Sequence, residues 1–300
     1  MTAAAAQAPA DLVVQAPHLP AAAIAAFRQR FPQADARRGR ASLRLCAVGA
    51  AQALAAPVAE MAERWRCDAA LVPPQLALSG LRVLALDMDS TLVRIECIDE
   101  LATLAGLGPQ VAAITEAAMR GEIADYAESL RRRVALLAGL DASLLQAVAD
   151  GPMALSPGAE LLLERARGAG LRTLLVTGGF GFFARILQHR LAIDSVWCNE
   201  VEIRDGRLTG AVHGPAASPR RLVDAQGKAE ALAQACARAG CPTAQAIAIG
   251  DGANDLPMLA LAGVAVAYHA KPRVRAATRL ALNYSGLDGV LEWFTDTARD

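Results

Sequence analysis

Two aspartates two positions apart follow an apolar run in the segment LRVLALDMDST, residues 81–91. Asp87 and Asp89 would stand where a buried strand ends. Burying a carboxylate there destabilises the fold unless a hydrogen-bond donor or a cation pairs with it. One such carboxylate could attack phosphorus as a nucleophile. The other could protonate a leaving alkoxide and then take a proton from water. The pair alone is weak evidence, because turns favour aspartate for structural reasons.

Two further apolar runs end in polar or glycine-rich turns. LRTLLVTGG carries Thr177 and Gly178, and QAIAIGDGAND carries Asp251 and Asn254. The carboxyl ends of parallel strands lie along one edge of a sheet, so we expect the three turns to form one site. Clustered carboxylates repel each other unless a cation lies between them, and Mg²⁺ suits oxygen ligands beside a phosphate. The TGG turn, which we expect to open a helix, could hold that phosphate on its N–H groups.

The elements that must position these turns alternate between strand and helix. Apolar runs without clean polar alternation are typical of parallel strands covered on both faces. We therefore predict an α/β fold, a doubly wound parallel sheet of Rossmann type at residues 79–300. The stretch between the first two clear strands is too long for a simple crossover, so residues 93–155 are expected to form an inserted helical cap. Residues 1–78 predict a small N-terminal α+β domain.

Two local predictions concern capping and turns. The segment SPGAELLLERARGAG predicts a helix with Ser156 as its N-cap, Pro157 in its first turn and Gly170 at its end. The segment EVEIRDGRLTGAV predicts a β-hairpin that turns at Asp205–Gly206.

Composition narrows the classes of function. The 300 residues have a formal net charge of zero and a pI near 6.9, which gives no general attraction to nucleic acid or anionic membranes. Six cysteines without a CxxC pair, with few histidines, favour free thiols in a reducing compartment over a zinc site. The N-terminus lacks the basic region of a signal peptide, and no uncharged apolar run reaches ~18 residues. We expect a cytoplasmic protein that binds neither nucleic acid nor membrane.

Four segments together resemble the motifs of the haloacid-dehalogenase-like phosphatase superfamily: DMDST, VTGG, Lys228 and GDGANDLPM. Within that superfamily, DMDSTLVRIECIDELA, LRRRV, TGGF and GDGAND are similar to the branch that hydrolyses O-phospho-L-serine in the last step of serine biosynthesis. The resemblance covers roughly residues 80–290. The N-terminal unit is similar to the extra domain of longer bacterial members.

The resemblance implies a Mg²⁺-dependent reaction with Asp87 as the nucleophile and Asp89 as the general acid and base. Mg²⁺ would be held by the carboxylates of Asp87 and Asp251 and by the backbone carbonyl of Asp89. Asn254 and Asp255 would support that set of ligands.

The same resemblance implies the substrate contacts. Thr177 and Gly178 would bind the phosphoryl group, and Lys228 would offset its charge during transfer. Glu96 would bind the ammonium group of the substrate, and Arg133 its carboxylate through a bidentate pair. The choice of Arg133 among three adjacent arginines rests on the resemblance alone.

Alternatives stay open. The same chemistry could act on another small phosphomonoester or transfer the phosphoryl group to an acceptor alcohol. A protein of a different class, a non-catalytic amino-acid sensor, could use the same scaffold. Residues 1–78 carry no identifiable chemistry, so a regulatory role, a role in a homodimer and a structural role are all compatible with them.

Overall fold

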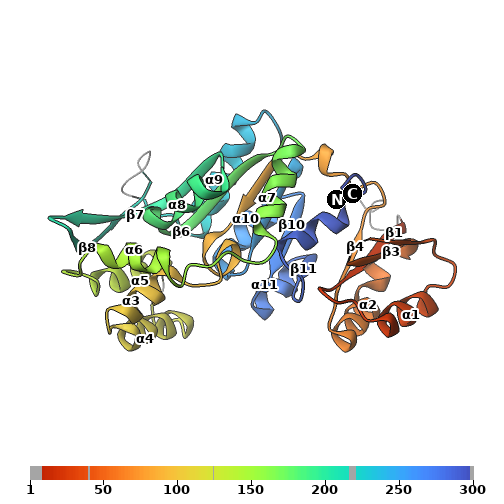
Figure 1. Ribbon diagram of the computed structural model, residues 1–300, viewed down its shortest axis with the longest axis horizontal. Helices are drawn as coiled ribbons and strands as arrows, with labels where there is room; N and C mark the ends of the chain where they lie inside the picture. The colour runs from red at the N-terminus through yellow and green to blue at the C-terminus, as the bar shows by residue number, and fades with distance from the viewer. Residues whose placement is uncertain (1–8, 40, 124, 216–220, 298–300) are drawn as a thin grey trace.

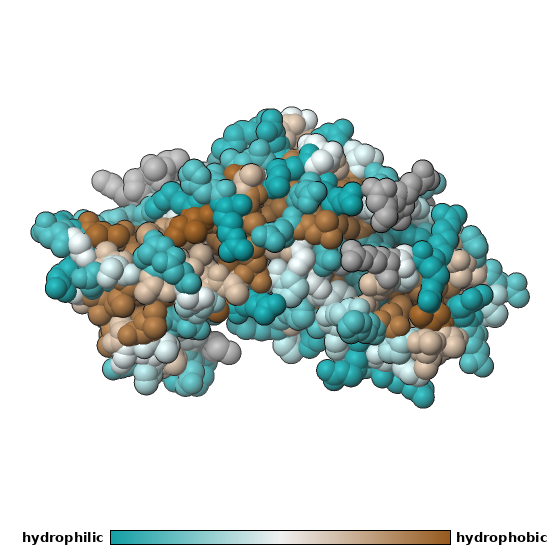
Figure 2. All heavy atoms as spheres, viewed as in Figure 1, coloured by the Kyte–Doolittle hydropathy of each residue, from teal (hydrophilic) through white to brown (hydrophobic). Residues whose placement is uncertain are grey.

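The computed structural model describes residues 9–39, 41–123, 125–215 and 221–297. The prediction about a signal peptide falls largely on residues 1–8, outside these ranges. Along the chain come an N-terminal unit, a central sheet flanked by helices, and a group of helices beneath one end of that sheet (Figure 1). Hydrophilic and apolar side chains are interspersed over the face drawn in Figure 2. No helix within the described ranges has both the length and the apolar character that crossing a membrane requires.

The main sheet of the described residues has seven strands in the order β11-β10-β9-β5-β6-β7-β8. All neighbouring pairs are parallel except β7 and β8, which form an antiparallel hairpin. The chain enters at β5 in the middle, and β6 and β9 lie on its two sides. The strand order therefore reverses at β5, and ligands bind at such a switch point in doubly wound sheets. The strands are β5 (Val83–Leu86), β6 (Arg172–Phe180), β7 (Ser195–Arg204), β8 (Arg207–His213), β9 (Ala246–Gly250), β10 (Val264–Tyr268) and β11 (Leu280–Leu282).

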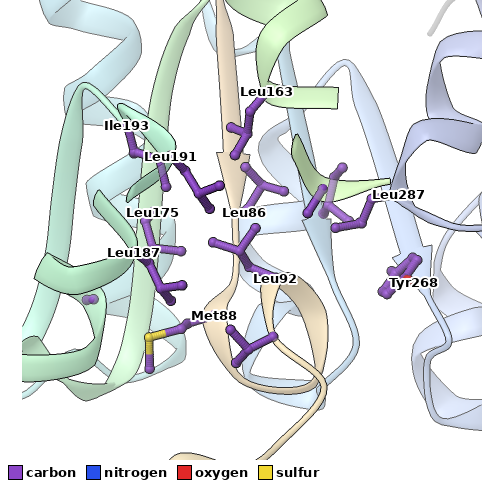
Figure 3. Packing of buried hydrophobic residues seen from close by; sticks show 14 of the residues in the cluster. Leu86, Met88, Leu92, Leu163, Leu175, Leu187, Leu191, Ile193, Tyr268 and Leu287 are labelled. Atoms are coloured by element: carbon purple, nitrogen blue, oxygen red, sulfur yellow. The ribbon is translucent and has the colours of Figure 1, made fainter. Parts of the chain in front are cut away.

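Both faces of this sheet are covered, which explains the continuous apolar runs of its strands. Leu84 and Leu86 of β5 point into one hydrophobic cluster, and Val83 and Ala85 point into another. Helices α7 (Ala159–Gly168) and α8 (Gly181–Leu191) cover the first face, where Leu175, Leu187 and Leu191 gather beside Leu86 (Figure 3). Helices α9 (Ala225–Arg238), α10 (Leu256–Leu261) and α11 (Pro272–Ala277) cover the second. This is the predicted doubly wound α/β arrangement.

Among the described residues, four α-helices precede α7 between β5 and β6. They are α3 (Cys97–Leu104), α4 (Gly108–Met119), α5 (Tyr126–Ala135) and α6 (Ser143–Asp150), and we call them the cap. An isolated antiparallel bridge joins Val93 to Leu155, where the chain leaves the core and returns to it. The predicted turn of the β7–β8 hairpin is present, with Asp205 and Gly206 both at positive φ.

The N-terminal unit has the order β1 (Pro9–Gln15), α1 (Ala21–Arg30), β2 (Ala36–Arg38), β3 (Ser42–Ala50), α2 (Ala51–Trp65) and β4 (Asp68–Val72). Its antiparallel sheet has the order β2-β3-β1-β4, which makes a ferredoxin-like βαββαβ unit. Leu12 and Val14 face its own helices, whereas Val13 faces the other way and joins the main core cluster. One face of this sheet is therefore packed on the rest of the protein.

Two local expectations were wrong. Helix α7 begins at Ala159, not near Pro157, because Gly158 precedes it at φ 76°, a left-handed conformation that interrupts a helix. The two glycines of the TGG turn do not open α8. They belong to the irregular last part of β6, which continues to Phe180 because that residue pairs with Asn199 of β7.

Candidate functional site

Asp87 and Asp89 line the same cavity because of the turn that follows β5. Both residues have extended backbone angles, and the backbone turns between Met88 and Leu92. The turn is closed by wide hydrogen bonds from Leu92 N to Asp87 O (3.3 Å) and from Val93 N to Met88 O (3.0 Å). Ser90 takes a left-handed conformation within it, at φ 55°.

Lys228 lies between two carboxylates at the base of the cavity. Its Nζ is 2.6 Å from Asp87 Oδ1 and 2.7 Å from Asp255 Oδ1, and all three side chains are buried. Burial opposes the charge of the lysine, but the negative charges of Asp255 and Asp87 outweigh it and raise the pKa of Lys228. Lys228 stands in the first turn of α9, whose start is capped by Asp224 Oδ1 accepting from Gly227 N at 2.7 Å.

Asp251 adds a further carboxylate to this group. One oxygen each of Asp87, Asp251 and Asp255 lie within 4.8 Å of one another. Burial and the charge of Asp255 raise the pKa of Asp87 well above its ordinary value, and the same two causes raise the pKa of Asp251 to about 6. Thr91 Oγ1 donates to Asp251 Oδ1 at 3.2 Å. An all-oxygen set with this excess of negative charge fits a hard divalent cation.

The Asp89 carboxylate contacts the start of the cap and the TGG turn. Its Oδ1 accepts from Cys97 N at 3.0 Å, at the start of α3, and a Cβ built on Gly179 would lie 2.6 Å from its Oδ2. Burial raises the pKa of Asp89 despite the hydrogen bonds from Cys97. Asp89 is thus a half-buried carboxyl group between the cap and the TGG turn, placed to hold a proton.

The TGG turn is fixed by polar contacts. Thr177 Oγ1 accepts from Gly179 N at 2.8 Å. Asn199, fully buried in β7, donates through Nδ2 to Gly178 O at 2.8 Å and accepts at Oδ1 from Val223 N at 2.7 Å. Sequence reasoning missed Asn199, which directly precedes the segment EVEIRDGRLTGAV of the predicted hairpin. This residue joins the turn to the segment that leads into α9.

Glu96 and Arg133 face the cavity from the cap. Ser90 Oγ donates to Glu96 Oε1 at 2.9 Å, and burial with the charge of Asp89 raises the pKa of Glu96 to about 7. Arg133 is half-buried, and its Nε has no hydrogen-bond partner among the described residues. Arg131 and Arg132 are exposed, and Arg132 pairs with Glu128 at 2.7 Å.

All the residues singled out in the sequence line a single cavity of about 620 Å³ or its buried base. Asn254 lies in the turn after β9 and contributes to the wall. Further polar residues that sequence reasoning did not name also line it: Asp99, Tyr126, Lys271 and Arg273. Tyr126 had a readable signal, because it precedes Arg133 by seven residues, or about two helical turns, on a predicted helix.

Comparisons with known proteins, by sequence and by structure, find relatives in the same family. A family model described as haloacid dehalogenase-like hydrolase matches residues 84–260. A phosphoserine phosphatase of Polaromonas sp. is 50% identical over 220 residues, which span 73% of this chain and 92% of the relative. A hydrolase of the HAD family from Salmonella enterica serovar Typhi is similar in structure, with a TM-score of 0.85 and 32% identity. The match covers 96% of this chain and 98% of that one. A probable phosphoserine phosphatase from Vibrio cholerae has a TM-score of 0.80 at 32% identity, covering 97% and 87%.

Proposed function

Because this chain belongs to the haloacid dehalogenase-like hydrolase family, and to the phosphoserine phosphatases within it, we propose that it hydrolyses O-phospho-L-serine to L-serine and phosphate. The proposal rests on one observation: groups that could act on a phosphoryl group and groups that could bind an amino acid line the same cavity. Asp87, Asp89 and Lys228 supply chemistry for a phosphoryl group, and Glu96 and Arg133 supply opposite charges for an amino acid.

We assign the metal to Mg²⁺, held by the carboxylates of Asp87 and Asp251 and by the backbone carbonyl of Asp89. The assignment is supported by the excess of buried carboxylate charge over the single contact cation Lys228. Bound there, the ion would neutralise charge on the phosphoryl oxygens and help to keep Asp87 ionised. Asp255, which accepts from Gly252 N at 3.0 Å and from Lys228, would hold the surrounding residues in place.

Asp87 attacks phosphorus in this proposal. Lys228 binds its Oδ1, which leaves Oδ2 to form the new bond to phosphorus while the bond from phosphorus to the seryl oxygen breaks. The lysine then balances part of the charge on the group in transfer. The product of this step is a phosphorylated Asp87 and free serine.

Asp89 moves the proton. Its raised pKa lets it hold a proton, and it donates that proton to the seryl oxygen as the ester bond breaks. The resulting carboxylate takes a proton from the water that attacks phosphorus. Phosphate leaves, Asp87 is restored as a carboxylate, and Asp89 is protonated again.

Glu96 and Arg133 select the substrate. The ammonium group of phosphoserine would pair with Glu96, and its carboxylate with the guanidinium of Arg133, whose Nε lacks a partner. An ester that lacks either group would leave one of these charges unpaired. The substrate class therefore follows from two residues on the cap, not from the residues that carry the chemistry.

Phosphate release tests the proposal. We expect the highest kcat/KM for O-phosphoserine, and losses of about tenfold or more for the same ester without its amino group and for phosphoethanolamine, which lacks the carboxylate. Arg133→Ala should remove discrimination for the carboxylate, whereas Arg132→Ala, at an exposed neighbour, should behave like the wild type. A higher kcat/KM for another ester would identify a different substrate, and no EDTA-sensitive release with any ester would favour a non-catalytic protein.

A further inference from the structure

We propose that the hydroxyl of Tyr126, on the cap, binds the phosphoryl group of the substrate. The inference builds on the proposed function above and adds a contact to it. The cap would then recognise both ends of the substrate, the amino acid through Glu96 and Arg133 and the phosphoryl group through Tyr126.

The position of the hydroxyl supports this role. Tyr126 is the first residue of α5 and lines the cavity together with Asp87 and Lys228. Its ring crosses from the cap to the TGG turn, where a Cβ built on Gly178 would lie only 2.1 Å from the hydroxyl oxygen. Only glycine at 178 permits this approach, so the hydroxyl lies directly against the residue proposed to bind the phosphoryl group.

The hydroxyl is available to a ligand. No hydrogen bond among the described residues involves it, and Tyr126 is half-buried in the wall of the cavity. A hydroxyl there can donate to a ligand, and phosphoryl oxygens are strong acceptors. Burial raises the pKa of Tyr126 to about 12, so the group keeps its proton and can donate it.

Charges of both signs surround the hydroxyl. Lys228 of the core and Arg133 of the cap both act on it, as do the carboxylates of Asp87 and Asp89. A neutral O–H can approach a phosphoryl group among these carboxylates without adding negative charge. It would complement Lys228, which is fixed on the other side by Asp87 and Asp255.

Helix α5 makes the two contacts interdependent. Tyr126 and Arg133 are seven residues apart, about two turns, and therefore share one face of a rigid helix. A substrate that holds Arg133 by its carboxylate would align Tyr126 with its phosphoryl group. Closure of the cap would then be coupled to the presence of both groups.

Tyr126→Phe tests the proposal, because it removes the hydroxyl and keeps the ring. We expect kcat/KM for phosphoserine to fall about tenfold or more, and the inhibition constant of inorganic phosphate to rise by a similar factor. Tyr284→Phe is the matched control, because its ring lies against Arg66, outside the cavity, and it should match the wild type. Arg133→Ala should raise KM for phosphoserine while the inhibition constant of phosphate stays within about twofold.

Two results would overturn the proposal: kcat/KM and phosphate inhibition both within about twofold of the wild type, or a raised KM for phosphoserine with unchanged phosphate inhibition. The second would place the hydroxyl at the amino-acid end of the substrate. If the wild type does not hydrolyse phosphoserine, the failure belongs to the proposed function. Phosphate inhibition, measured with whichever ester is hydrolysed, then still decides the role of Tyr126.

Discussion

At the residue scale, the site is defined by an imbalance of charge. Lys228 contacts Asp87 and Asp255, but Asp251 lies within the same group, and the half-buried Asp89 and the exposed Glu96 add carboxyl groups nearby. Burial raises the pKa of each group for which a shift is found among these acids. The folded protein must therefore take up protons or a cation here.

This imbalance predicts how pH and Mg²⁺ together affect stability. Asp251 and Glu96 have folded pKa values of about 6 and about 7, above the roughly 4 of an unfolded chain. Their ionisation therefore costs stability progressively as pH rises from about 4 to about 7, and below that window the cost is absent. A cation held by Asp251 removes the part of this cost that comes from Asp251, so Mg²⁺ should raise the unfolding temperature more at pH 8 than at pH 5.

Thermal unfolding at the two pH values, with and without Mg²⁺, measures this effect. Asp251→Asn should reduce the Mg²⁺-dependent increase at pH 8, because it removes one ligand and one buried charge. An equal increase at both pH values in the wild type would contradict the assigned cation site.

The sequence was informative about residues that follow apolar runs. Asp87, Thr177 and Asp251 could be placed together because the ends of parallel strands share one edge of the sheet. Tyr126 was overlooked although its spacing to Arg133 was visible in the sequence. Asn199 was not found, because its importance comes from contacts with segments far away in the chain. A sequence motif identifies the residues that follow a strand, but it does not identify the distant side chains that contact them in the fold.

At the scale of elements, the β7–β8 hairpin supports the cap. Gly139 N donates to Leu208 O at 2.8 Å, Leu208 N to Leu140 O at 2.9 Å, and Ala142 N to Gly206 O at 2.8 Å. Gly210 of β8, at φ 84°, packs closely on the end of α5, since a Cβ there would lie 3.3 Å from Ala135 Cα and 2.9 Å from Ala138 Cβ just beyond the helix. The hairpin thereby helps to fix the helix that carries Tyr126 and Arg133.

Gly210→Ala should loosen the cap. The substitution adds a clash with the cap to the strain of a left-handed backbone, whereas Gly240→Ala, at φ 66° with open space around it, adds the strain alone. We expect each to lose about 1 kcal/mol of stability from strain, and Gly210→Ala to lose more and to lower kcat/KM for phosphoserine. Limited proteolysis of residues 93–155 would report the loosening. Indistinguishable stability, proteolysis and activity in the two variants would contradict the supporting role.

Element boundaries were harder to predict than element types. Helix α7 starts later than predicted because Gly158 takes a left-handed conformation. The TGG turn belongs to β6, and not to α8 as predicted, because Phe180 pairs with β7. The β7–β8 hairpin was predicted correctly from Asp205–Gly206, since a two-residue turn is specified by its own residues. Local signals suffice for such a turn, whereas strand ends depend on the neighbouring strand.

At the scale of the whole molecule, the N-terminal unit is joined to the core through buried polar contacts. The Asp68 carboxylate accepts hydrogen bonds from the backbone N–H groups of Asn283, Tyr284 and Ser285. Arg44 donates to the carbonyl of Trp293 at 2.7 Å and pairs with Asp11 at 3.0 Å. Val13 and Val72 contribute to the main hydrophobic cluster.

Asp68→Ala should destabilise the protein without changing its chemistry. It leaves backbone N–H groups unpaired at a buried junction, so we expect a loss of about 2 kcal/mol or more in urea unfolding, with kcat nearly unchanged. Asp35→Ala removes an acid from an exposed pair with Arg37 and should have little effect. If both variants were equally stable, the junction would contribute less than its contacts indicate.

The sequence suggested a separate N-terminal unit, but it carried no signal for this junction. Val13 reads as one more apolar residue of a strand, and only the packing places it in the main core. A regulatory role for residues 1–78 and a homodimer stay predictions. The contacts at Asp68 and Arg44 identify the surface through which any such effect would reach the core.

The proposed reaction depends most on covalent transfer of the phosphoryl group to Asp87. Enzyme quenched during turnover of phosphoserine and treated with borohydride should contain homoserine at position 87, since borohydride reduces an acyl phosphate but not a free carboxylate. Mass spectrometry of the peptide that contains residues 83–94 would detect it, and Asp87→Asn should give neither homoserine nor phosphate release. Full turnover by Asp87→Asn, or homoserine at another aspartate, would contradict the account.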